Sequence, residues 1–587
     1  MRRLIGKGIE RTAGLLMDQL ERGEGRGLHW EGRLSDSALS TSVAALALSL
    51  ADRQRFQGLI EGGIYWLRGT QNEDGGWGDT PGSLSNMSTS LLAWCALTAA
   101  PGSRESSHCE RRVEGYLRRQ TGGLSPDDIS REVRAVYGQD KTFSAPILAT
   151  CALAGRMGQG KDAWRLVPGL PFEVSCLPQG FFRLVRLPVV SYAIPALIAV
   201  GLVAFRRKGA KGLSSFLRRA SVGKSLDVLS RTQPANGGFL EATPLTSFVV
   251  MCLCGAGEKD HEVVRKGVSF LERSVRREGS WPIDTHLATW VTTSAVSALS
   301  SLGGASPLGP VQREGLLQWI LEQQFTEPHP FTGAAPGGWA WTPLPGGVPD
   351  ADDTAGALVA LAVLDPGKDR SREPAENGVL WLLNLQNRDG GFPTFCKGWG
   401  RLPFDRSCPD ITAHAVKAFR AWLPHLSAGV ASKANRSLRR AVQYLNEEQG
   451  RDGSWLPLWF GNQEASNHRN PTYGTAKVVQ SCDDLPGAGK GLSFLDGSRN
   501  EDGGWGGGPG AASSIEETAL ALQALSLEAD RYRSAIASGL HWLDRATDNF
   551  QRFPPAPIGL YFSSLWYAEE LYPLIFTLQA LSSLAPT

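Results

Sequence analysis

Three carboxylates lie within four residues of the sequence, at Asp350, Asp352 and Asp353, and Thr354 follows them directly. The preceding proline and the apolar run 355–361 predict a buried helix that begins at this acidic cluster. Carboxylates that crowd together in a low-dielectric site raise one another's pKa, so one of them is expected to stay protonated at neutral pH and to act as an acid. The alternative is an ordinary helix N-terminus whose acids are solvated.

The composition limits the classes of protein to which the chain can belong. The chain has 587 residues, enough for two or more domains, and its net charge of +2 gives no reason to expect nucleic acid as a partner. Its 18 Trp and 68 Gly indicate a recurring Gly-Trp motif or an aromatic-lined cavity. The nine Cys form no CxxC pair, which is typical of reduced, buried thiols in a cytosolic protein. We interpret Cys252 and Cys254 as core residues and not as metal ligands.

A short unit recurs along the chain: an aromatic-Leu pair or its apolar equivalent, then Gln (absent from the copies at 270–281 and 494–505), then Gly-Gly or Gly-Ser and an aromatic residue. The stretches between copies are helical in pattern, so the sequence predicts an all-α chain of repeated helical hairpins. Such hairpins form a solenoid when open and a toroid when closed, and the irregular period favours closure. We expect the repeat tryptophans to act mainly as structural staples. The copies lie at 65–78, 226–239, 270–281, 381–392, 444–455 and 494–505, with degenerate copies at 319–324 and 542–543.

The glycine-rich turns do not match cofactor sites. No Gly-Lys-Ser/Thr follows them and no strand precedes them, so they are not phosphate-binding loops. Neither a DDxxD-type diphosphate motif nor an HExxH-type zinc motif occurs. We therefore predict no metal and no cofactor.

Segment 187–205 approaches the length of a membrane span and carries no charge before Arg206. Two internal prolines favour a buried helix, or a helix dipped into the bilayer surface with a basic flank. Residues 1–19 predict an amphipathic helix and not a signal peptide.

The repeats and the 350–354 motif together resemble the squalene–hopene cyclase family of class II terpene cyclases, with its QW repeat and DxDDT acid motif. The resemblance implies two α/α barrels (toroids) that enclose a large apolar cavity. The catalytic barrel would comprise 1–26 plus 280–587, and 27–279 would form a second, inserted barrel. It also implies monotopic attachment to the cytoplasmic side of a membrane.

The resemblance further assigns roles to the polar residues. Asp352 would protonate a terminal C=C bond, with Asp350 and Asp353 as its flanking carboxylates, and His414 would support the acid. The alternative for His414 is a satisfied core histidine. The remaining members of the implied acid network are Asp405, Asp410 and Tyr473, the last of which would help to reprotonate the acid.

Aromatic side chains would stabilise the carbocation by cation–π attraction, worth about 0.5–2 kcal/mol each in a desolvated site. Core packing is the alternative for every one of them. Ile283 occupies the position of an expected cavity tryptophan, with Trp281 two residues earlier. The predicted substrate-binding residues are Trp341, Phe395, Trp459, Trp281, Tyr192, Tyr561, Trp566 and Tyr567.

The predicted activity is a proton-initiated polycyclisation of squalene or a related linear polyprenoid to a polycyclic, hopene-like triterpene. Alternatives are a cyclase of a shorter or modified polyprene, a protein-prenyltransferase-like toroid and a non-catalytic lipid-binding toroid. The sequence does not specify how many rings form or whether the final cation is deprotonated or hydrated. It also does not specify whether the protein is a monomer or a homodimer.

Overall fold

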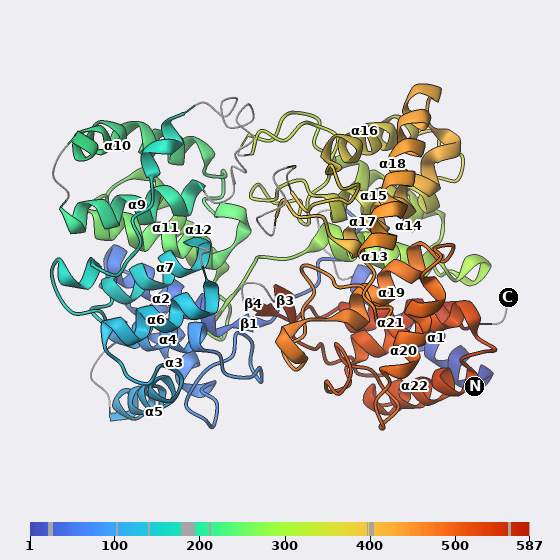
Figure 1. Cartoon of the computed structure of the whole chain (residues 1–587), viewed down its shortest axis with the longest axis horizontal. Helices are drawn as coiled ribbons and strands as arrows, with labels where there is room; N and C mark the ends of the chain where they lie inside the picture. The colour runs from blue at the N-terminus through green and yellow to red at the C-terminus, as the bar shows by residue number, and fades with distance from the viewer. Residues whose placement is uncertain are drawn as a thin grey trace.

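The computed structural model describes residues 1–21, 27–100, 104–138, 141–177, 194–209, 213–330, 332–395, 397, 404–560 and 565–585. The described part is mainly helical, with two short antiparallel strand pairs, β1 (Asp36–Ser37) with β2 (Trp281–Pro282) and β3 (Ile558–Leu560) with β4 (Leu565–Tyr567). Figure 1 shows two lobes of helices, and both chain ends lie in the lobe that contains the second half of the chain. The predicted fold class, all-α with two α/α barrels, is confirmed.

The lobe that carries the acid motif, here called the acid-motif barrel, is a closed double ring. Each inner helix contacts the next, and the last contacts the first. The inner helices are α13 (Ala288–Ser300), α15 (Ala351–Leu364), α17 (Pro409–Trp422), α19 (Pro471–Ser481), α21 (Ile515–Leu525) and α23 (Tyr572–Ser583). The outer helices are α1 (Arg2–Glu21), α14 (Pro310–Glu322), α16 (Arg372–Leu385), α18 (Ala428–Glu447), α20 (Ala488–Gly497) and α22 (Arg533–Ala546).

The other lobe, here called the inserted barrel, repeats this plan with a smaller inner ring, which also closes on itself. Its inner helices are α2 (Ala38–Asp52), α4 (Met87–Ala96), α7 (Lys141–Leu153), α9 (Ile194–Lys208) and α11 (Thr243–Ala256). Its outer helices are α3 (Gln57–Gly69), α5 (Arg104–Thr121), α6 (Pro126–Tyr137), α10 (Leu213–Thr232) and α12 (Glu262–Ser274).

Each lobe has its own hydrophobic core. Residues 5–30 and 288–581 contribute to one core, and residues 38–281 together with Val348 contribute to the other. The chain therefore changes from one core to the other between Trp30 and Ala38 and again between Trp281 and Ala288, a few residues beyond the predicted bounds of the inserted barrel.

The repeat turns join an outer helix to the next inner helix by three kinds of hydrogen bond. The indole N–H of Trp505 donates to the Leu495 carbonyl at 2.6 Å, and its backbone N–H donates to the Thr518 hydroxyl at 2.9 Å. The Gln386 amide donates to two carbonyls, one in its own turn and one in the next outer helix. The same indole bond is made by Trp77, Trp281 and Trp455, so these tryptophans are staples of the double ring.

One glycine turn lies directly before the acid motif. Gly337 has φ +112°, and a Cβ atom there would lie 2.7 Å from the Asn377 carbonyl oxygen. Glycine is required because other residues avoid this conformation and have no room for their side chain. The turn completes the degenerate copy at 319–324, because Gln324 donates to the Gly337 carbonyl and the Trp339 indole donates to Ile320.

The described part of the apolar segment 187–205 belongs to α9, whose residues from Ile194 to Phe205 pack in the inserted core. This agrees with the buried-helix alternative for those residues, and 187–193 lie outside the described part. Among the described residues, we find no helix with the length and apolar character needed to cross a membrane.

Candidate active site

The acid motif forms the first turn of α15 in the acid-motif barrel. Asp350 is the N-cap, and its Oδ1 accepts the backbone N–H groups of Asp352 and Asp353, each at 2.9 Å. Thr354 joins this turn to the repeat, because its hydroxyl accepts the Trp339 backbone N–H at 3.0 Å and donates to the Asp350 carbonyl at 2.6 Å. The first and last residues of the motif therefore hold the turn in place, and the side chain of Asp352 is left to face the barrel interior.

The two flanking carboxyl groups are the deeply buried members of the motif. Burial raises the pKa of Asp350 to about 7, and burial together with the neighbouring carboxylate charge raises the pKa of Asp353 well above its usual range. The interaction between the two side chains lowers the pKa of Asp350 and raises that of Asp353, so Asp353 is the member of the pair that favours its protonated form. The side chain of Asp352 is 18% exposed and lines a cavity.

His414 lies opposite Asp352, on α17. Its Nδ1 is 2.6 Å from Oδ1 of Asp352, which places the imidazole within hydrogen-bond distance of the predicted acid. The edge of the Trp290 ring packs against the imidazole, with ring centroids 6.1 Å apart. The structure thus brings together two predicted residues that are 62 positions apart in the sequence.

Asp410 lies one helical turn before His414 and lines the same cavity. The thiol of Cys408 donates to its Oδ1 at 2.5 Å, and the Leu458 backbone N–H donates to the sulfur. Burial, followed by the charge of Asp352, raises the pKa of Asp410 to about 7. The group therefore lies close to its midpoint at neutral pH.

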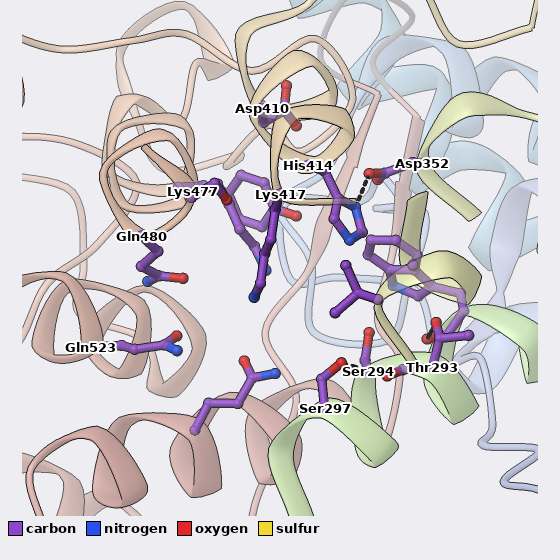
Figure 2. Close-up of a pocket in the computed structure, with 16 residues that line it drawn as sticks. Thr293, Ser294, Ser297, Asp352, Asp410, His414, Lys417, Lys477, Gln480 and Gln523 are labelled. Atoms are coloured by element: carbon purple, nitrogen blue, oxygen red, sulfur yellow. Dashed lines mark hydrogen bonds and ion pairs between the residues drawn. The ribbon is translucent and has the colours of Figure 1, made fainter. Parts of the chain in front are cut away.

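These side chains surround a cavity of about 70 Å³ inside the acid-motif barrel, shown in Figure 2. A water molecule needs about 10–15 Å³, so the cavity has room for several. Tyr473 on α19 also lines it, and burial raises the pKa of this phenol well above its usual range. Residues from all six inner helices contribute to the lining.

Half-buried aromatic side chains gather at the junction of the two barrels. Trp341, Phe395 and Trp459 are predicted from the sequence to bind substrate, and the Phe395 ring contacts the other two at centroid distances of 6.1 Å and 5.9 Å. Phe404 joins them at 5.2 Å from Trp459. Trp459 packs on the core of the acid-motif barrel and the other three rings on the core of the inserted barrel, so the group provides aromatic faces at the junction.

Tyr567 on β4 is directed toward the acid-motif barrel. Its ring lies 6.5 Å from that of Tyr572, and the charges of Asp284 and Asp352 are close enough to help raise the pKa of its phenol. Successive side chains of a strand point to opposite faces, so Trp566 points away from Tyr567. The Trp566 ring packs on His468, and its predicted role in substrate binding stays a prediction.

One prediction needs correction, one stays untested, and two fall outside the described residues. Trp281 is fully buried and donates its indole N–H to the Leu271 carbonyl, so it is a repeat staple and not a cavity residue. Asp405 is fully buried and is not among the residues that line the cavity of Asp352 and His414, so its place in the acid network stays a prediction. Tyr192 and Tyr561 lie outside the described residues.

The structure also shows site residues that the sequence analysis missed. Trp290 on α13 packs against His414, and Phe460 stacks on Tyr473 with centroids 4.3 Å apart. Lys417 and Lys477 line the cavity. Helical spacing could have identified both lysines as site residues, because Lys417 lies one turn after His414 and Lys477 lies one turn after Tyr473.

Metal ligands do not gather in the described part of the chain, where no group of three His, Cys, Asp or Glu side chains could hold an ion. The carboxyl groups around Asp352 are bound to backbone N–H groups, a thiol and an imidazole. This donor set suits proton chemistry.

Comparisons with known proteins agree with this geometry. Residues 287–550 match the squalene–hopene cyclase C-terminal domain, and residues 37–139 match the prenyltransferase α-α toroid domain. The chain is 26% identical to the squalene–hopene cyclase of Alicyclobacillus acidocaldarius over 78% of its own length and 75% of that protein. These matches together support the squalene–hopene cyclase family for this chain.

Two other similarities show how much of this chain and of each compared protein the match covers. The chain is 26% identical, over 82% of its length, to a terpene cyclase–glycosyl transferase fusion protein of Humicola fuscoatra, but it spans only 42% of that protein. An ent-copalyl diphosphate synthase from Streptomyces platensis superimposes with a TM-score of 0.62 over 98% of this chain and 99% of that one, at 18% identity. That likeness supports the two-barrel fold.

The Thr354 hydroxyl makes two hydrogen bonds, accepting the Trp339 backbone N–H and donating to the Asp350 carbonyl, and this double role gives a testable prediction. Thr354→Val leaves the buried Trp339 N–H without a partner, so we expect a stability loss of about 1–3 kcal/mol and a lower thermal midpoint. We also expect at least a tenfold lower turnover, because the first turn of α15 moves and Asp352 with it.

Thr518→Val is the matched control, because Thr518 binds Trp505 in the same way on α21, whose first-turn carboxyl groups, Glu516 and Glu517, do not line the cavity of Asp352 and His414. It should lower the thermal midpoint similarly and leave turnover at the wild-type value. Equal turnover of the two variants would contradict the positioning role of Thr354.

Proposed function

We propose that this protein is a class II cyclase that protonates the terminal C=C bond of a linear polyprenoid, with squalene as the favoured substrate and a polycyclic triterpene as the product. The observation that carries the proposal is the Asp352–His414 pair, joined at 2.6 Å on the inner surface of a closed barrel. The paired groups lie on two inner helices, α15 and α17, and are held by the repeat bonds of those helices.

The geometry suits the protonation of a weak base. An alkene accepts a proton only from a strong acid, and a carboxylic acid becomes stronger when its conjugate base is stabilised. An Nδ1–H of His414 stabilises the carboxylate that Asp352 becomes, and the proton leaves from the other carboxyl oxygen to the alkene carbon. The new C–H bond takes the π electron pair, and the neighbouring carbon becomes the cation.

The aromatic rings at the junction supply what the cation needs next. Trp341, Phe395 and Trp459 present π faces, and each desolvated cation–π contact contributes about 0.5–2 kcal/mol. Attack by each following C=C bond then closes a ring and moves the charge along the chain. Loss of a proton to a basic group, or addition of water, then removes the charge of the last cation.

Product analysis with parallel substrates tests the proposal. Purified protein in detergent is incubated with squalene, geranylgeranyl diphosphate and 2,3-oxidosqualene, and the extracts are analysed by gas chromatography and mass spectrometry. The expected result is a cyclic hydrocarbon or alcohol from squalene without added metal. Cyclisation of only the diphosphate would replace squalene by a shorter substrate, and turnover of none of the three would contradict the cyclase proposal.

We further propose that the protein works at a membrane surface, because squalene dissolves in lipid. Phe216 and Leu217 on α10 are 68% and 57% exposed. Arg219 lies one turn after Phe216 on α10, and it lines a surface pocket together with Phe205 and Arg206 of α9. Exposed apolar side chains beside basic ones favour binding to anionic lipid surfaces.

A double variant, Phe216→Glu with Leu217→Glu, is expected to lower binding to phosphatidylglycerol vesicles at least about tenfold, because two apolar side chains no longer enter the bilayer. Flotation of vesicles with bound protein measures this. Val311→Glu is the control, since Val311 is 75% exposed on α14 of the other barrel. Equal vesicle binding by wild type and the double variant would contradict this attachment surface.

A further inference from the structure

The cavity beside Asp352 continues along the barrel axis as a polar lumen. Ser294 and Ser297 line it from α13, one turn apart, and Ser301 lies one further turn along, at the exposed end. The Ser301 hydroxyl donates to Ser582 of α23 at 2.8 Å. Because residues three and four apart share one helix face, this serine stripe runs from the acid pair to the outer end of the barrel.

Two lysines extend into this lumen, as Figure 2 shows. Lys417 belongs to an inner helix, yet its side chain is exposed, because it faces the lumen and not the packed core. Lys477 is half-buried, with its ammonium group 4.8 Å from the Phe576 ring centroid and 5.5 Å from that of Tyr473. Burial lowers the pKa of Lys477 to about 8; the charges of Asp352 and Asp410 act against this shift, and the charge of Lys417 adds to it.

Among the described side chains that line the lumen, more positively charged groups than negatively charged groups lack a close ion-pair partner. Within the described ranges, neither ammonium group forms an ion pair. The carboxylates of the cavity are engaged elsewhere, Asp352 with His414 and Asp410 with the Cys408 thiol. When Asp352 carries the proton that the reaction needs, only Asp410 is left to balance two ammonium groups.

Polar groups without charge complete the surroundings of the lysines. The amide side chains of Gln523 and Gln579 line the same cavity from α21 and α23. Amide N–H groups and ammonium groups are hydrogen-bond donors, and buried positive charge is costly unless an anion or water compensates it. A lumen of about 70 Å³ accommodates a monatomic anion together with water.

We propose that the lumen of the acid-motif barrel binds a small inorganic anion, of halide size, between the ammonium groups of Lys417 and Lys477. The site lies between the acid pair and the outer end of the barrel. All of its lining residues belong to the protein, so the free protein can bind the anion without a polyprenoid.

Bromide is the probe that tests this site directly. Crystals of the full chain are soaked in sodium bromide, and diffraction data are collected at the bromine absorption edge. The expected result is an anomalous peak in the lumen, within contact distance of both ammonium groups. Anomalous peaks confined to the outer surface of the protein would overturn the proposal.

A solution measurement guards against variants that fail to fold. The excess line width of the ³⁵Cl nuclear magnetic resonance signal reports exchange of chloride with a protein site. Lys417→Met with Lys477→Met is expected to remove most of the excess width seen with wild type, and Lys477→Arg, which keeps the charge, should retain it. Circular dichroism checks that each variant is folded, and an unchanged width in the folded double variant would also overturn the proposal.

Discussion

Asp352→Asn is expected to lower product formation by at least about 10³-fold while the protein stays folded. The amide of Asn has nearly the shape of the carboxyl group, so the first turn of α15 and its cap from Asp350 remain. What the variant lacks is an acidic proton. An amide does not protonate an alkene, and no other carboxyl group of the motif shares the position of Asp352 opposite His414.

The flanking carboxyl groups make this test specific. Asp350 accepts two backbone N–H groups and so holds the turn, and the side chain of Asp353 is buried and does not line the cavity. Neither is placed to replace the missing acid. Gas chromatography of squalene extracts measures the loss, with turnover referred to the amount of folded enzyme.

Asp530→Asn is the matched control, because the Asp530 side chain is 99% exposed and lies between α21 and α22, on the outer surface of the same barrel. It should retain wild-type turnover. A residual activity of Asp352→Asn within tenfold of wild type would show that another group supplies the proton.

The double ring was predictable because its signal is repeated. Each copy places a glycine turn and an aromatic residue at a fixed distance from a helix end, and the structure shows the same indole-to-carbonyl bond in copy after copy. The acid motif was predictable for a similar reason, since its residue types and spacing are rare. His414 required the family resemblance, because no local pattern links it to Asp352.

The errors have a common physical origin. A repeat staple and a cavity aromatic are both tryptophans in an apolar context, so sequence could not separate Trp281, which donates to Leu271, from Trp459, which faces the junction. Sequence also could not give the face of β4 on which Trp566 lies, because strand alternation depends on a register that a short, isolated strand does not reveal. Lys417 was missed because a single lysine in a helix usually points to bulk solvent. Here its side chain points into the polar lumen that the ring of inner helices surrounds.

His414→Leu is expected to lower turnover about 10²-fold, which is less than the loss in Asp352→Asn. Leu fills much of the imidazole volume next to Trp290 but donates no hydrogen bond. The carboxylate left after proton transfer then loses its partner at 2.6 Å, and the acid becomes weaker. The effect should appear in kcat and leave KM nearly unchanged, because the interaction strengthens only as the proton leaves.

His414→Asn separates a hydrogen-bond role from a packing role, because the Asn side-chain amide lies near the position of the imidazole Nδ1. It should recover roughly tenfold of the activity lost in His414→Leu, since a neutral donor returns but the option of a charged one does not. A double variant, Asp352→Asn with His414→Leu, should be no slower than Asp352→Asn alone, because residues that act as one unit are not additive. Additive losses would mean that His414 acts on a different step, and wild-type turnover of His414→Leu would reduce the imidazole to a core residue that happens to lie beside the acid.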